Sequence, residues 1–459
     1  MRSIRRIFDE FKGENIMKSS REVALNAIYD IENNGLYSNL GVNKHLRESN
    51  LKDMDRGFCT ELIYGVTENK YFLNYVIDSF SKIKAKKLSP HVRNILQMGI
   101  YQIIFLDSTK DFAAVNESVN LSKKYCKKAS GFVNGVLRNV VRKQTEIKYP
   151  DKNEDIIKYL SIKYSYEEWI VKNWIDKFGQ DFTEELVEEN NEKPDLYIRT
   201  NELKISRDDL IKKLEEQGIE CEKIKLVKEA IKVKGLKNIE KNELFKRGYY
   251  QIQDISSMII GHVINPSEND NVLDVCSAPG GKTTHLATLM NNNGKVVARD
   301  VFDHKLNLIK ENTKRLGINN VEIQKIDATV FDDDSVEKFD TVLVDAPCSG
   351  FGIIRRKPEI KYKKKKDLEG IPEIQKKILQ NSSKYVKKGG LLIYSTCTIE
   401  DRENIDIVNE FLKLNDDFKL EPIENINVDL ENQEDGYIKL YPNIHGMDGF
   451  FIAKLRRMR

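Results

Sequence analysis

Two cysteines in the C-terminal half of the chain stand where a thiol could act as a nucleophile. Cys348 follows an apolar run in "FDTVLVDAPCSGFG", and Cys397 follows another in "GGLLIYSTCTIEDREN". We expect the two runs to be neighbouring strands, so that both thiols face the crevice at the strand ends. A thiolate there can add to an electron-poor ring carbon. In cytosine methylation, for example, the thiolate attacks C6, which makes C5 carbanion-like enough to accept a methyl group. The chemistry of the residues alone does not say which cysteine attacks.

This reaction needs a methyl donor, and the stretch "VCSAPGGKTTH", Val275 to His285, is a turn where a ligand can approach the backbone. A phosphate loop of the form G-x-x-x-x-G-K-[ST] would need glycine at Cys276, and Pro279 lacks an amide that such a loop uses. We therefore exclude the phosphate loop, and the dinucleotide fingerprint G-x-G-x-x-G is also absent. A Gly-rich turn remains, followed by a helix that starts near Lys282 and whose amides can meet a carboxylate.

Four aspartates stand at the predicted ends of four successive strands. Asp274 ends the first strand, and Asp300 ends the second, where an acid can accept from both ribose hydroxyls. Asp327 ends the third, in position to accept from an adenine amine, and Asp345 ends the fourth. An adenosine ligand with an amino-acid end and no phosphate is S-adenosylmethionine (SAM). We therefore predict SAM as the methyl donor, with Asp345 placed to stabilise charge at N3 and the exocyclic amine of the cytosine.

Residues 251–459 supply the elements that must hold these side chains. Apolar segments such as "NVLDVC", "KVVARD" and "GGLLIYST" alternate with amphipathic segments such as "KTTHLATLM" and "DHKLNLIKENTKRLG". That alternation predicts a doubly wound, mostly parallel α/β sheet of the Rossmann type. The late segments "GYIKLYPN" and "GFFIAKLRR" are expected to form an antiparallel hairpin at the edge of this sheet.

The N-terminal region, residues 17–145, has helical periodicity throughout, as in "SSREVALNAIYDIENN", and predicts an all-α domain. Its segment "AAVNESVNLSKKYCKKASGFVNGVLRNVVRKQ" carries basic residues along a helical surface. That surface is either a solvated helix face or a ridge that contacts an RNA backbone through its phosphates. The basic residues concerned are Lys123, Lys124, Lys127, Lys128, Arg138, Arg142 and Lys143.

Residues 146–250 are more charged and predict a helical bridge, followed after Pro194 by a small α+β unit. The order there is strand "LYIRTN", helix "SRDDLIKKLEEQGI", and short strands near "CEKIKLV" and "AIKVKG". We expect Arg199 and Asn201, at the end of the first strand, on the surface, as ordinary exposed residues or within reach of RNA.

The composition sets limits on the class of protein. The 459 residues include 75 Lys and Arg against 72 Asp and Glu, a net charge of +3, which neither demands nor excludes nucleic acid. No apolar run approaches the roughly 20 residues of a membrane span, so we expect a soluble protein. The first 16 residues lack the apolar centre of a signal peptide. We expect them to be a frayed extension or the result of an upstream start codon, with Met17 opening the folded domain.

The cysteines and histidines argue against metal and disulfide chemistry. The six cysteines contain no C-x-x-C pair, and the six histidines are equally scattered. This usage is typical of a reducing cytoplasm, and we predict no metal site.

Two parts of the chain resemble known families. The helical segments "DRGFCTELIYGV", "RNILQMGIYQIIFL" and "AAVNESVNLSKKY" resemble the RNA-binding domain of the NusB antitermination factor family. Over residues 195–459, "DVCSAPGGKTTHLA", "DAPCSGFG", "RRKPEIK", "YSTCTIEDREN" and "DGFFIAKLRR" resemble the RNA 5-methylcytosine methyltransferases of the NOL/NOP/Sun type. Together with the element pattern, these resemblances predict three regions: a NusB-like helical RNA-binding domain over residues 17–145, a helical linker and a small α+β RNA-recognition subdomain over 146–250, and a SAM-dependent methyltransferase domain over 251–459.

The methyltransferase resemblance also implies roles for single residues. The T-C cysteine is the nucleophile in that family, here Cys397, and the P-C cysteine, here Cys348, assists product release. "VF" follows Asp300 where bacterial relatives often have an acid two residues on, so Asp300 has no such helper. The implied SAM-binding positions are Cys276, Ser277, Ala278, Pro279, Gly280, Gly281, Lys282, Asp300, Asp327 and Asp345.

A NusB-like domain in front of such a methyltransferase resembles the branch of the family that acts on bacterial 16S ribosomal RNA. The expected partner is therefore 16S rRNA, for a cytoplasmic monomer that binds neither DNA nor membranes. Methylation of tRNA remains an alternative. A non-catalytic RNA-binding antitermination factor is a second one, but it predicts loss of a rim cysteine or of the Gly-Gly turn, and both are present.

Overall fold

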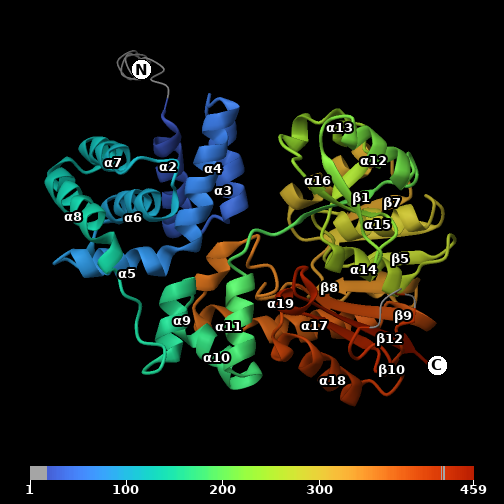
Figure 1. Cartoon of the computed structure of the whole chain (residues 1–459). Coiled ribbons are helices and arrows are strands. Elements are labelled where there is room, and N and C mark those ends of the chain that lie inside the picture. Colours follow the sequence, from blue (N-terminus) through green and yellow to red (C-terminus); the bar gives the residue numbers. More distant parts are fainter. Residues whose placement is uncertain (1–17, 425, 427–429, 459) are drawn as a thin grey trace, which may run out of the picture. The chain divides into compact units, whose positions relative to one another are not determined.

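The computed structural model of the chain describes residues 18–424, 426 and 430–458 (Figure 1). The extension predicted for residues 1–16 lies outside this part of the chain. The chain forms two compact units: one runs to Val187 and takes in Arg356–Tyr362, and the other comprises Glu188–Arg355 and Lys363–Arg459. Within the described residues, no helix is both long and apolar enough to cross a membrane.

The helical unit confirms the all-α prediction. Ser19 caps its first helix by accepting from the Glu22 backbone N–H, and the apolar face of that helix is buried, as its spacing predicts. The helices of the NusB-like part are α2 (Ser20–Asn34), α3 (Ser38–Arg47), α4 (Asp53–Glu68), α5 (Lys70–Phe80), α6 (Pro90–Phe105), α7 (Asp111–Tyr125) and α8 (Ser130–Lys143).

The basic segment is not one helix. Helix α7 ends at Tyr125 and α8 begins at Ser130, because Cys126 leaves the helical region with φ −154° and ψ 56° and a short 3-10 turn follows. All seven basic residues of the predicted ridge are exposed. Lys124 pairs with Glu22 at 2.6 Å and Lys143 with Glu146 at 2.9 Å.

Three more helices follow: α9 (Ile156–Tyr164), α10 (Glu168–Phe178) and α11 (Gln180–Glu189), of which α11 ends two residues into the second unit. The segment Arg356–Tyr362, which carries most of "RRKPEIK", also packs within the helical unit. Its Tyr362 hydroxyl donates to the Thr67 carbonyl at 2.7 Å. Lys361 is fully buried and donates to the Tyr164 carbonyl at 3.3 Å, and burial lowers the pKa of Lys361 to about 8.

The second unit begins with a small α+β subdomain, as predicted. Its described strands form a four-stranded antiparallel sheet in the order β2-β3-β1-β4. The elements are β1 (Leu196–Thr200), α12 (Arg207–Glu215), β2 (Glu220–Lys223), β3 (Ala230–Lys234), α13 (Glu243–Lys246) and β4 (Tyr250–Ile252).

The larger part of this unit is the predicted α/β domain (Figure 1). Its helices are α14 (Ile255–Ile264), α15 (Gly281–Leu289), α16 (Asp303–Leu316), α17 (Ile371–Ser383), α18 (Ile405–Leu414) and α19 (Pro442–His445). Its strands are β5 (Asn271–Asp274), β6 (Lys295–Asp300), β7 (Val321–Lys325), β8 (Phe339–Asp345), β9 (Val386–Thr396), β10 (Phe418–Leu420), β11 (Tyr437–Leu440) and β12 (Phe450–Arg457).

The described strands of the large sheet follow the order β10-β12-β9-β8-β5-β6-β7, with β11 on β12. Strands β5 to β9 pair in parallel, and β10, β11 and β12 pair antiparallel. The late hairpin is confirmed, but its second strand was wrongly expected at the edge. Strand β12 lies between β9 and β10 and is buried over most of its length.

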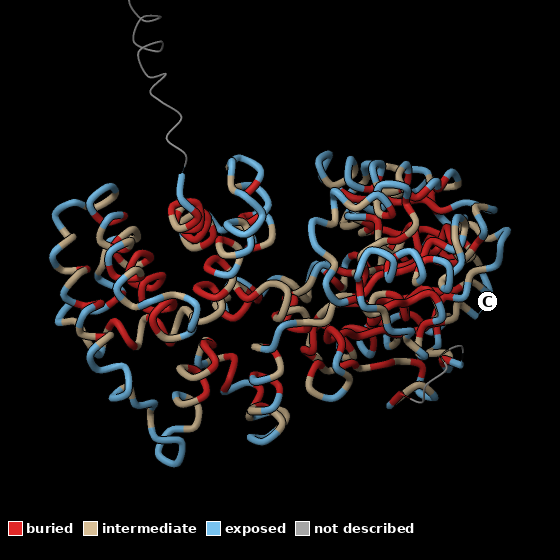
Figure 2. The backbone as a smooth tube through the Cα atoms, turned by 45° about the horizontal axis from the view of Figure 1, so that its top comes forward, coloured by how far each residue is buried: buried red, intermediate tan, exposed pale blue. Residues whose placement is uncertain are grey.

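Alternating strand residues build two cores, one on each face of the sheet. Val272 and Val296 contribute to the core beneath α14 and α15, whereas their neighbours Leu273 and Val297 contribute to the core beneath α17 and α18. Figure 2 shows buried residues concentrated in the interior of the α/β part and, separately, inside the helical bundle.

Candidate active site

The glycine turn links the end of β5 to the start of α15. Gly280 caps α15 with φ +98° and ψ 11°, a backbone conformation that favours glycine. A Cβ atom on Gly280 would also lie 3.3 Å from the Ile309 Cα. A Cβ on Gly281 would meet nothing nearer than Gln253, at 3.9 Å. The two glycines therefore differ: the conformation requires Gly280, while Gly281 has room around it.

Lys282 and Asp345 form an ion pair beside this turn. The Lys282 Nζ lies 2.7 Å from Asp345 Oδ2, and the Ser395 hydroxyl donates to Asp345 Oδ1 at 2.9 Å. Burial alone would lower the pKa of Lys282, but Asp345 outweighs burial, so the pKa lies above its usual value. The Lys282 ammonium also lies 5.1 Å from the centroid of the Phe450 ring. Lys282 and Ser395 thus fix the position of the Asp345 side chain at the end of β8.

Asp274, at the end of β5, is near the Lys282–Asp345 pair and is almost fully buried. The Thr283 hydroxyl donates to its Oδ2 at 2.8 Å. Burial raises the pKa of Asp274 to about 7, and the nearby Asp345 carboxylate acts in the same direction.

The two candidate thiols meet, as their strand positions predict. Cys348 lies three residues beyond the end of β8, and Cys397 directly follows β9, its parallel neighbour. Their Sγ atoms are 3.2 Å apart. The hydrogen bond to Cys397, and then burial, raise the pKa of Cys348 well above its usual value. Cys348 therefore keeps its proton next to the Cys397 sulfur.

A second group of side chains, which the sequence analysis did not identify, fixes the two cysteine loops to each other. The Ser349 hydroxyl lies 2.7 Å from the Thr398 hydroxyl, and the Ser349 backbone N–H donates to Glu403 Oε2 at 2.7 Å. Burial raises the pKa of Glu403. Gln375 donates to the Pro347 carbonyl at 3.0 Å. The sequence feature that could have identified Glu403 is its place in "YSTCTIEDREN", the same segment that carries Cys397.

The other two predicted carboxylates lie at the ends of the next strands. Asp300 ends β6, is 7% exposed, and accepts from the Val301 backbone N–H at 2.8 Å. Asp327 lies two residues beyond the end of β7, is exposed, and accepts from the Thr329 backbone and hydroxyl, both at 2.8 Å. The Thr329 backbone N–H, then its hydroxyl, lower the pKa of Asp327. The remaining turn residues are Cys276, Ser277, Ala278 and Pro279; burial raises the pKa of the Cys276 thiol.

Arg199 and Asn201 are not on the surface, so that expectation was wrong. Their exposed fractions are 1% and 2%. Arg199 donates to the Gly281 carbonyl in the first turn of α15, and Asn201 donates to the Leu316 carbonyl at the end of α16, at 2.7 and 2.8 Å. Both residues hold the small subdomain against the catalytic domain.

Two histidines that are far apart in the sequence, His262 and His285, share Glu229 as a partner in the structure. The His285 Nε2 lies 2.6 Å from Glu229 Oε1, and the His262 Nε2 lies 3.0 Å from the same oxygen. These three residues are of types that bind metals. The His262 distance is that of an N–H···O hydrogen bond, and the His285 distance is slightly shorter than the usual range.

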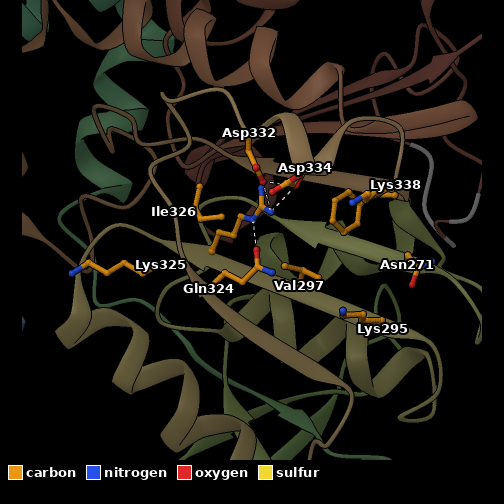
Figure 3. A pocket seen from close by; sticks show the side chains of 12 residues that line it. Asn271, Lys295, Val297, Gln324, Lys325, Ile326, Asp332, Asp334 and Lys338 are labelled. Carbon is orange, nitrogen blue, oxygen red and sulfur yellow. Dashed lines mark hydrogen bonds and ion pairs between the residues drawn. The ribbon is translucent and has the colours of Figure 1, made fainter.

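A hollow of about 800 Å³ opens on the sheet (Figure 3). It is lined in part by Val297, Gln324 and Asp332, and the segment between β7 and β8 borders it. Arg299, which is buried, donates to Gln324 Oε1 and to Asp332 Oδ2, both at 2.9 Å. Among the described residues that line it, none is a predicted site residue. It adjoins the glycine turn at Arg299, whose carbonyl accepts from the Ser277 hydroxyl at 2.8 Å.

Comparison with known proteins agrees with this architecture. Residues 261–456 match the family described as 16S rRNA methyltransferase RsmB/F, residues 18–142 match the NusB family, and residues 166–240 match a ferredoxin-like domain of RsmF/B-like methyltransferases. The "Probable ribosomal RNA small subunit methyltransferase B" of Bacillus subtilis is 38% identical over 451 residues, which cover 96% of this chain and 99% of that protein. The Synechocystis protein of the same name is 32% identical and covers 96% of this chain and 100% of its own length.

Solved structures share the fold of the chain. The structure of PH0851 has a TM-score of 0.82 at 26% identity and covers 95% of this chain and 98% of its own. A methyltransferase homologue from Pyrococcus horikoshii has a TM-score of 0.57 at 29% identity and covers 65% of this chain and 98% of its own. The chain therefore belongs to the RsmB/F family of 16S rRNA methyltransferases, with a NusB domain and a ferredoxin-like subdomain ahead of its catalytic domain.

Proposed function

We propose that this RNA methyltransferase transfers a methyl group from SAM to C5 of a cytosine in 16S rRNA, through a covalent bond between Cys397 and C6. The observation that carries the proposal is the pair of thiols at the ends of neighbouring strands, 3.2 Å apart, next to the Lys282–Asp345 pair and the glycine turn. In this proposal Cys397 is the nucleophile, Asp345 contacts the cytosine, and the glycine turn binds SAM. All three lie along one edge of the sheet.

The residues of the turn fit SAM. Gly280 and Gly281 leave the backbone without side chains where α15 begins, and the amides of a helix N-terminus favour a carboxylate. Asp300 at the end of β6 is suited to the ribose hydroxyls and Asp327 to the adenine amine. SAM supplies an electrophilic methyl group when it is bound.

The chemistry assigns a separate task to each protein group. The Cys397 thiolate attacks C6 and forms an S–C bond, which places a pair of electrons on C5 to take the methyl group. The C5 proton then leaves to a base, the S–C bond breaks, and the thiolate is restored. Asp345 accepts from the exocyclic amine, since each of its oxygens keeps a second lone pair beside Lys282 and Ser395. Cys348, which holds its proton, supports release of the product.

The RNA assignment draws support from the relatives and from charge. The two relatives in Bacillus subtilis and Synechocystis are named as small subunit ribosomal RNA methyltransferases. The exposed basic residues of α7 and α8, together with the turn between them, form a surface suited to phosphate contacts.

Labelled SAM and unmodified 16S rRNA test this function. The wild-type protein is expected to place label at C5 of a single cytosine, and the Cys397→Ala variant is expected to place none above background. Undiminished transfer by Cys397→Ala would rule out the mechanism. Label appearing in tRNA but not in 16S rRNA would replace the substrate assignment while leaving the chemistry intact.

A further inference from the structure

Arg199 and Glu229 are buried charges of the ferredoxin-like subdomain that lie side by side. Arg199 is on β1, and Glu229 directly precedes β3, its antiparallel partner. The Thr200 backbone N–H donates to the Glu229 carbonyl at 2.9 Å. Their side chains are 1% and 2% exposed, and both contact the helix that follows the glycine turn.

Arg199 binds the first turn of α15 from the side of the small subdomain. One terminal nitrogen, Nη1, donates to the Gly281 carbonyl at 2.7 Å and to Gln253, while Nη2 donates to the Thr284 hydroxyl at 3.0 Å. Thr284 in turn donates to the Gly280 carbonyl, from its hydroxyl at 2.7 Å and its backbone at 2.9 Å. The guanidinium therefore fixes both glycines, one directly and one through Thr284.

Glu229 holds the next residue of the same helix. Its Oε1 accepts from His285 at 2.6 Å and from His262 of α14 at 3.0 Å. The hydrogen bonds from the two histidines lower the pKa of Glu229 even though burial acts in the opposite direction. Glu229 is therefore a carboxylate, and it partly compensates the charge of Arg199, whose pKa burial lowers to about 9.

Stability alone does not explain why a charged arginine occupies position 199. The hydrogen bonds of Arg199 go to neutral acceptors: an amide, a carbonyl and a hydroxyl. A buried charge is costly, and replacing it with apolar groups often leaves stability unchanged or raises it. What the planar, forked guanidinium gives here is fixed geometry at several acceptors of one turn.

We propose that Arg199 and Glu229 are positioning residues for the methyl donor: the ferredoxin-like subdomain holds the Gly280–His285 turn in the geometry that binds SAM. This inference rests on the proposed function, because it takes the turn to be the SAM site. It gives the small subdomain a part in donor binding that is separate from any contact with RNA.

The test compares SAM binding in Arg199→Met and Arg199→Lys with a matched pair, Arg207→Met and Arg207→Lys. Arg207 lies in the same subdomain and donates to the Ile224 carbonyl within it, at 3.2 Å. Loss of a charged hydrogen-bond donor at the turn is expected to raise the dissociation constant for SAM about tenfold to a hundredfold in Arg199→Met. Lysine, which keeps the charge but not the fork, is expected to recover part of this loss.

Three further readings separate positioning from simple destabilisation. At saturating SAM the methyl-transfer rate of Arg199→Lys is expected within about threefold of wild type, and hydrogen exchange should rise in residues 276–290. Both Arg207 variants are expected to bind SAM as the wild type does.

An unchanged SAM affinity in a folded Arg199 variant would overturn the proposal, even if its melting temperature is lower. If Arg199→Met does not fold, the SAM affinity of Arg199→Lys provides the test. Failure of the wild type to bind SAM would instead refute the proposed function.

Discussion

The change Gly280→Ala separates two reasons for having glycine in the turn. From the sequence, Gly280 and Gly281 have the same expected task, which is to let a ligand approach the backbone. The structure gives them different surroundings. Gly280 has φ +98°, and an added Cβ would lie 3.3 Å from the Ile309 Cα, whereas a Cβ on Gly281 would lie 3.9 Å from Gln253 in ordinary helical backbone.

The magnitude follows from these two facts. Placing an L-residue in a left-handed conformation costs about 1–2 kcal/mol. The close approach to Ile309 adds to this cost, and the lower entropy of the unfolded alanine chain offsets about 0.4–1 kcal/mol. We expect Gly280→Ala to lower the free energy of unfolding of the catalytic unit by about 1–2 kcal/mol. With a urea slope of about 2–3 kcal/mol per molar for a unit of this size, the midpoint should fall by about 0.5 M.

The assay must report on the catalytic unit. Trp169 and Trp174, the only tryptophans of the sequence, lie in α10 of the helical unit, so their fluorescence would follow the wrong part. Hydrogen exchange of peptides from β5 and β8, measured as a function of urea concentration, follows the unfolding of the catalytic unit.

Gly281→Ala is the matched control. Its free energy of unfolding is expected to equal or exceed that of the wild type, because alanine favours a helix. Equal midpoints for the two variants would refute the conformational argument.

Two other predictions concern charge. Burial raises the pKa of Asp274 to about 7 in the folded protein. Between about pH 4 and pH 7, Asp274 is therefore protonated in the folded state but ionised in the unfolded state. The free energy of unfolding accordingly falls as the pH rises through this range. Asp274→Asn should therefore gain stability relative to wild type at pH 8 compared with pH 5, in urea unfolding followed by hydrogen exchange; an equal difference at both values would contradict this. Replacing Lys127 and Lys128 by Gln should reduce the log–log salt slope of RNA binding by about 1–2, measured by filter binding, while the exposed pair Lys212 and Lys213 on α12 should leave it unchanged. An unaltered slope in the first variant would remove that surface from the RNA interface.

Much of the fold could be predicted because the strands of a parallel sheet are buried on both faces and are therefore nearly continuous apolar runs. The cysteines could be placed for the same reason, since Cys348 and Cys397 follow two such runs. The pairing of those runs as neighbours, with Asp345 opposite Ser395, brings the thiols together. Local pattern and chain order were sufficient for that part of the site.

The contacts of polar residues could not be predicted, because their partners lie far along the chain. Arg199 reaches Gly281 across 82 residues and Asn201 reaches Leu316 across 115. A polar residue at the end of a strand has the same local pattern whether water or a buried carbonyl satisfies it. The convergence of His262 and His285 on Glu229 was hidden in the same way, because it depends on how the small subdomain docks on α14 and α15.

The central claim is that Cys397 forms the bond to the cytosine while Cys348 helps to break it. The two sulfurs are 3.2 Å apart, so both thiols can reach one cytosine ring, as this division of roles requires. Removing Cys348 should slow release and let the adduct accumulate, while removing Cys397 should prevent it.

The most direct measurement is a denaturing gel of Cys348→Ala, Cys397→Ala and the double variant after incubation with SAM and labelled, unmodified 16S rRNA. We predict a protein–RNA band that resists denaturation in Cys348→Ala and no such band in the other two. A covalent band in Cys397→Ala, or free turnover without an adduct in Cys348→Ala, would contradict the assignment of the two cysteines.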